Sequence, residues 1–87
     1  MHEASLMQNL MRQIETIAAE EKATKVTAVK VWCGAFSHMT AAHFGEHFNH
    51  AATGSIAEGA TLDITISDDI ADDRAQDILL ESIDVAT

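Results

Sequence analysis

The first three residues, Met1, His2 and Glu3, carry the donor types of a transition-metal site. The amine of Met1, the backbone amide nitrogen of His2 and the His2 imidazole can all reach a single ion. With a further donor such as Glu3 or water, they suit a flat site of nitrogen and oxygen ligands, the geometry typical of Ni(II) and Cu(II). The sequence therefore predicts a metal site built on the chain end itself.

Three more histidines, His43, His47 and His50, follow one another at spacings of four and three residues. In a helix this spacing places them on one flank, where two neutral imidazoles could share a metal ion. A solvated polar flank is the competing interpretation. Residues 43–47 also match the H-x-x-E-H string of a class of zinc peptidases. We reject a peptidase, because those enzymes need a larger domain and a distant third ligand.

Apolar residues near the N-terminus recur every three or four positions and predict an amphipathic helix. Ser5 and Gln8 have the spacing of a capping-box pair, which places the helix start at Ser5. A second helix, which carries the three histidines, is predicted over about residues 40–53, with Gly54 suited to its C-terminal cap. The apolar stripe of the first helix consists of Leu6, Met7, Leu10, Met11, Ile14, Ile17 and Ala18.

Alternation of apolar and polar residues predicts three strands, at residues 26–34, 61–67 and about 78–85. The last strand changes phase, which indicates a β-bulge near Glu81 and Ser82. The order helix, strand, helix, strand, strand predicts an α+β fold, a single small domain in which two helices cover one face of a three-stranded sheet.

Length and composition restrict the possible functions. The 87 residues make one domain, spanning 1–87, and the net charge of −9 with five Lys and Arg excludes nucleic acid as a partner. No stretch approaches the roughly twenty apolar residues of a membrane helix, and no signal peptide is recognisable, so we expect no membrane association and a cytoplasmic location. The single cysteine, Cys33, excludes an internal disulfide and is expected to be a small core residue of the first strand.

Motifs along nearly the whole chain resemble those of the HypA/HybF family, the nickel-insertion accessory proteins of nickel–iron hydrogenase maturation. The resemblance is carried by Met1-His2-Glu3, Ser5-Leu6, Val26-Thr27-x-Val29, Cys33-Gly34-Ala35-Phe36-Ser37, Gly54-Ser55-x-Ala57-Glu58-Gly59-Ala60 and Leu80-Glu81-Ser82-Ile83-Asp84-Val85. It implies a metallochaperone that is not an enzyme. Ni(II) would be held at His2, with Glu3 beside it, and delivered to a hydrogenase or a related metalloenzyme.

The same resemblance implies two partners, the nickel-binding GTPase of hydrogenase maturation and the hydrogenase large subunit. An unprotected edge strand in so small a sheet also permits a homodimer. A metal-independent adaptor, which would dock a maturation partner around Trp32 or the second helix, is the alternative function. An enzyme that uses the histidines of the second helix is a third.

One departure from the family is large. Its members normally carry a zinc-binding insert with two Cys-x-x-Cys pairs between the last two strands. This chain has only Cys33, and the acidic stretch 68–74 stands at that place. We therefore expect a shortened member with no zinc domain and no structural zinc, because a closed zinc site needs four Cys or His ligands.

Overall fold

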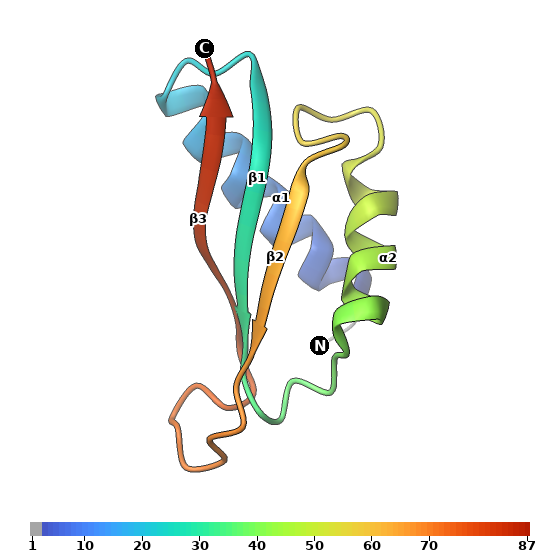
Figure 1. The fold of residues 1–87 in the computed structure, drawn as a ribbon, viewed down its shortest axis with the longest axis vertical. Coiled ribbons are helices and arrows are strands. Elements are labelled where there is room, and N and C mark those ends of the chain that lie inside the picture. The colour runs from blue at the N-terminus through green and yellow to red at the C-terminus, as the bar shows by residue number, and fades with distance from the viewer. Residues whose placement is uncertain (1–2) are drawn as a thin grey trace.

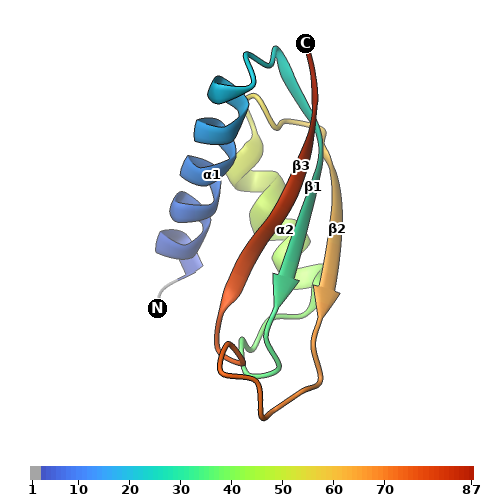
Figure 2. The same ribbon diagram turned by 90° about the vertical axis from the view of Figure 1, so that its left-hand side faces the viewer.

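The computed structural model describes residues 3–87, with side chains from Ser5 onward. Its elements follow in the predicted order, namely α1 (Glu3–Glu20), β1 (Lys25–Cys33), α2 (Ala41–Ala52), β2 (Thr61–Ile66) and β3 (Ile78–Ala86). Both helices lie on the same side of the three-stranded sheet (Figures 1 and 2). The predicted α+β fold is confirmed. None of the described helices is long and apolar enough to cross a membrane.

The sheet has the strand order β2-β1-β3, with β1 parallel to β2 and antiparallel to β3. Lys30 faces Ser82 and Val31 faces Leu80, which leaves Glu81 as an extra residue in β3. The predicted bulge is therefore confirmed, since an extra residue in one strand is what breaks the alternation.

A second irregularity in the β1–β3 pairing was not predicted. It lies between Val26 and Ala28 of β1. With Thr27 inserted there, Val26 and Val29 can both turn inward although they are three residues apart, and both are buried.

Helix α1 begins at Glu3, two residues before Ser5, so the predicted capping box is wrong. Ser5 and Gln8 instead lie inside the first turns of the helix. The predicted apolar stripe is confirmed, because five of its seven residues are buried and Leu6 is packed against them. The longer helix brings regular structure up to the residue that directly follows His2.

Helix α2 is fixed at its start and along its inner face. The Thr40 hydroxyl accepts a hydrogen bond from the backbone N–H of His43 at 3.1 Å, which caps the first turn. Phe44 and Phe48 are fully buried one turn apart. Since these two rings hold one side of the helix against the core, the three histidines lie on its outer sides, with His43 and His50 exposed and His47 half-buried.

Cys33 is fully buried in the core, as predicted, and burial raises the pKa of its thiol above the ordinary value of 9.0. A neutral thiol in apolar surroundings is a poor metal ligand. We expect Cys33→Ser to lower the free energy of unfolding by about 1–3 kcal/mol, because it places a hydroxyl in an apolar site. Urea unfolding measures this loss. Nickel affinity should not change in the folded variant, and a clear fall would make Cys33 a ligand.

Candidate metal-binding site

The predicted N-terminal site lies mostly outside the described residues. Met1 and His2 precede the described chain, and Glu3 is described only as the first residue of α1. The site at Met1, His2 and Glu3 therefore stays a prediction. The structure does describe the surroundings of the helical turn that follows this site.

A hollow of about 620 Å³ lies beside the first turns of α1. Leu6 of α1 lines it together with His38 and Met39, from the connection between β1 and α2, and with Asp77, which precedes β3. His38 has a φ of 61°, a left-handed conformation that is uncommon for residues other than glycine. An imidazole and a carboxylate thus border the same hollow as Leu6, four residues after His2.

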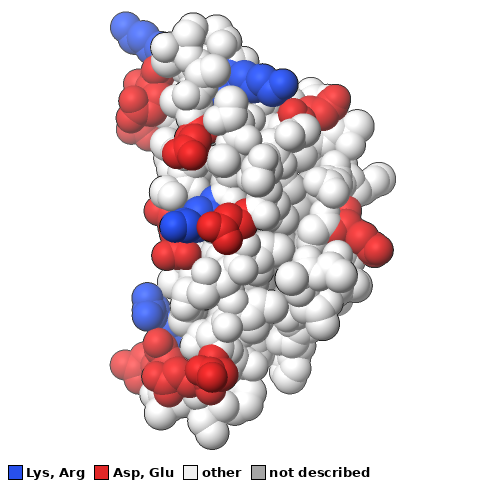
Figure 3. All heavy atoms as spheres, viewed as in Figure 1, with Lys and Arg blue, Asp and Glu red and all other residues white. Residues whose placement is uncertain are grey.

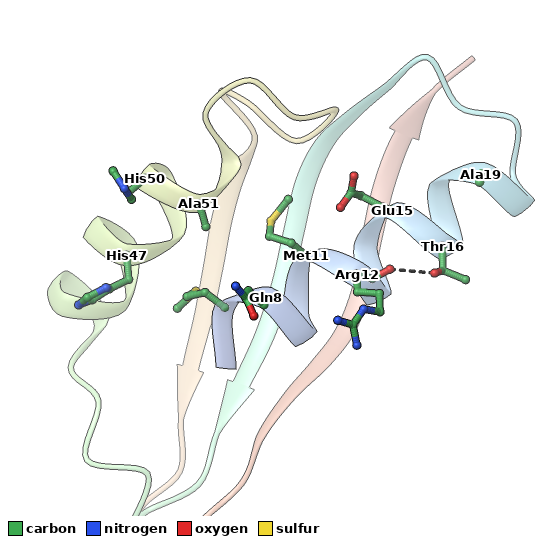
Figure 4. Close-up of a pocket in the computed structure, with 10 residues that line it drawn as sticks. Gln8, Met11, Arg12, Glu15, Thr16, Ala19, His47, His50 and Ala51 are labelled. Carbon is green, nitrogen blue, oxygen red and sulfur yellow. Dashed lines mark hydrogen bonds between the residues drawn. The ribbon is translucent and has the colours of Figure 1, made fainter. Parts of the chain in front are cut away.

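The histidines of α2 lie on the flank that their spacing predicted. The ring centroids of His43 and His47 are 4.5 Å apart, with the ring planes at 70°. His47 and His50 line the rim of an open groove of about 1160 Å³ between α1 and α2. Figure 4 shows Met11 and Ala51 directed into the space between the helices, while His47 and His50 stand on the outer side of α2.

Among the side chains that the structure describes, from Ser5 onward, no three His, Cys, Asp or Glu residues are grouped closely enough to hold a metal ion. His43, His47 and His50 therefore do not form a three-ligand site, although His43 and His47 are close. The described part of the chain supplies no closed metal shell of its own.

The acidic stretch 68–74 is organised by Arg74. The Asp72 carboxylate accepts hydrogen bonds from the Arg74 guanidinium at 3.2 Å and from the Arg74 backbone N–H at 2.8 Å, and these bonds lower the pKa of Asp72. The guanidinium also lies 4.7 Å from the centre of the Trp32 ring, within cation–π range. This contact was not predicted, and it partly covers the Trp32 surface that the adaptor hypothesis requires.

Charge is unevenly distributed over the face seen in Figure 3. Acidic side chains gather along the β3 side and around the connection between β2 and β3, whereas the α2 side carries few charges.

Comparison with known proteins decides the family. The family model described as "Hydrogenase/urease nickel incorporation, metallochaperone, hypA" matches residues 1–72. The chain belongs to the HypA family. Its relatives include the hydrogenase maturation factors HypA of Nitrosospira multiformis, 38% identical over 64 residues, and of Archaeoglobus fulgidus, 35% identical over 66 residues. That of Escherichia coli is 39% identical over 62 residues.

The fold is also that of HypA. The solution structure of the Ni metallochaperone HypA from Helicobacter pylori superposes with a TM-score of 0.82 at 21% identity, covering 99% of this chain and 98% of that one. A second HypA solution structure gives a TM-score of 0.75, also at 21% identity, and covers 97% of this chain and 95% of that one. The predicted family is confirmed.

The matches to the curated HypA proteins are partial on both sides. They cover 74%, 76% and 71% of this chain, and 56%, 60% and 53% of the relatives from N. multiformis, A. fulgidus and E. coli. The chain thus spans a little over half the length of the curated HypA relatives it matches. The match to the family model includes the N-terminal residues, because it begins at residue 1.

Proposed function

We propose that this chain carries Ni(II) during the maturation of nickel–iron hydrogenase or a related nickel enzyme. The observation that supports this most is the match of residues 1–72 to a family of nickel-incorporation metallochaperones. The matched relatives are named hydrogenase maturation factors. In this role the metal is cargo, and no side chain has to act as acid, base or nucleophile.

The proposed ligands are the Met1 amine, the His2 amide nitrogen and the His2 imidazole, with Glu3 or water as a further donor. Three nitrogen donors from two consecutive residues close small rings around one ion and favour the flat coordination of Ni(II). Among the described side chains of α1, the first buried one is Met7, so we expect metal to enter and leave without disturbing the core. Affinity should fall in acid, because protons compete for the same nitrogens.

Delivery requires that another protein takes the metal. We propose the nickel-binding GTPase of hydrogenase maturation and the hydrogenase large subunit as partners. A ligand set at the end of the chain suits this transfer, because donors of the partner can replace its ligands one at a time. Residues 1–87 would act in this exchange as a single nickel-binding domain.

A transfer assay tests the function. The nickel-loaded chain is mixed with immature hydrogenase large subunit and the maturation GTPase, in the presence of a chelator that removes free Ni(II). The large subunit should acquire nickel from the wild-type chain but not from His2→Ala. If His2→Ala supports maturation as well as wild type, the chain acts as an adaptor and the carrier role is wrong.

We also propose that the folded state needs no zinc. The only cysteine, Cys33, is buried in the core, and the described residues offer no group of three metal-binding side chains. Treatment with a strong chelator followed by dialysis should therefore leave the melting temperature unchanged. Loss of the cooperative thermal transition, with recovery on adding Zn(II), would show that zinc is structural.

A further inference from the structure

Two imidazoles on α2 are already close enough to share an ion. His43 and His47 are one helical turn apart, and their ring centroids are separated by 4.5 Å. His43 is exposed and His47 is half-buried, so solvent and dissolved ions can reach the pair. Both donors lie in the middle of the sequence, far along the chain from Met1 and His2.

The helix holds the pair in place. The Thr40 cap bonds to the His43 backbone N–H at 3.1 Å, and the adjoining residues Phe44 and Phe48 are fully buried. The backbone positions that carry the two imidazoles are therefore fixed by a capped turn and by core packing. Fixed donors raise metal affinity, because less conformational freedom is lost on binding.

We propose that His43 and His47 form a second metal site, an open two-histidine site for a divalent transition-metal ion such as Ni(II), Cu(II) or Zn(II). Neutral imidazole is a suitable ligand for all three ions. Two imidazole ligands leave the remaining coordination positions to water or to further donors. Such a site binds weakly and exchanges quickly, which distinguishes it from the chelate proposed at the N-terminus.

His50 is the nearest competitor for this role. It lies three residues after His47, but no three-ligand group forms among the described residues. The 4.5 Å ring contact joins His43 to His47. The pair formed by His43 and His47 is therefore favoured over the pair formed by His47 and His50.

The test uses the full chain with an acetylated N-terminus and His2→Ala, which silences the proposed N-terminal site. Zn(II) is added alone, and the imidazole resonances are followed by NMR, because this ion is diamagnetic. The signals of His43 and His47 should shift together and follow a single one-site binding curve. His43→Ala removes a proposed ligand and should weaken Zn(II) binding about tenfold or more. Loss of a group that only hydrogen-bonds to a metal ligand already lowers metal affinity by about 10–100-fold.

Two control variants make the outcome decisive. His50→Ala and His38→Asn should leave the affinity unchanged, the second because Asn tolerates the left-handed backbone at that position. Circular dichroism checks that α2 is intact in every variant. The proposal is overturned if the two rings do not respond to Zn(II), or if His50→Ala weakens binding as much as His43→Ala. Neither result bears on the N-terminal site, which is absent from this background.

Discussion

Replacing His2 with alanine is expected to abolish tight Ni(II) binding and to leave the melting temperature of the metal-free protein unchanged. The imidazole supplies one of the three proposed nitrogen donors, and its loss should weaken binding at least about 100-fold, or roughly 2.8 kcal/mol. The melting temperature should stay unchanged, because the first described buried side chain of α1 is Met7, five residues after His2. Calorimetric titration of untagged protein and a thermal melt measure the two effects.

The matched control removes the other histidines of interest. Replacement of His43, His47 and His50 by alanine together should retain tight Ni(II) binding, because none of these residues belongs to the N-terminal site and only the weaker site on α2 is lost. If His2→Ala binds Ni(II) normally while the triple variant has lost all affinity, the metal lies on α2. The ligand set inferred from the HypA resemblance would then be wrong.

Gly34→Ala is expected to be the most damaging small substitution in the fold. Gly34 follows β1 and is buried where residues 74–77 cross the end of the strand. Its backbone N–H donates a hydrogen bond to the Asp77 carbonyl at 2.8 Å, and a Cβ at this position would overlap the carbonyl oxygens of Arg74 and Ala75. Since those atoms are backbone, the connection between β2 and β3 must move away.

Overpacking of this kind costs about 1–3 kcal/mol and occasionally more, and we expect about 3 kcal/mol because no flexible side chain can yield. A small domain loses about 4–8 °C of melting temperature per kcal/mol, so the expected fall is roughly 12–24 °C. Displacing Arg74 from the Trp32 ring should also change the fluorescence of Trp32, the only tryptophan. Urea unfolding followed by this fluorescence measures both effects.

Gly45 provides a matched control within the same chain. It lies in α2, and a Cβ built there meets nothing within 4 Å. Gly45→Ala should therefore stabilise the protein by about 0.4–1 kcal/mol, because alanine favours the helix and restricts the unfolded chain. Equal stability of the two alanine variants would show that the contact of Gly34 with residues 74–77 is not close.

Sequence periodicity was informative wherever a local repeat controls burial. The stripe of α1 and the phase break at Glu81 could both be predicted, since each is a property of consecutive residues. The contact of Arg74 with Trp32 could not be predicted, because it joins residues 42 positions apart and leaves no periodic signal. The same holds for the packing of Gly34 against the connection that precedes β3.

The two candidate metal sites also differ in how much of each could be predicted from the sequence. The spacing of His43 and His47 was sufficient to predict a shared flank, but their ring separation required the structure. The proposed N-terminal site uses backbone nitrogens, which any sequence supplies, so only His2 and its position could indicate it. That is why the resemblance to the HypA family carried more weight than the residue pattern.

The most direct test of the N-terminal site is a paired calorimetric titration with Ni(II). One sample is the untagged chain with a free Met1 amine, and the other is the same chain acetylated at that amine, with no side chain altered. Ligation by the amine predicts one tight site in the first sample and an affinity at least about 100-fold lower in the second, or roughly 2.8 kcal/mol. Equal affinities in the two samples would contradict a nickel site built on Met1 and His2.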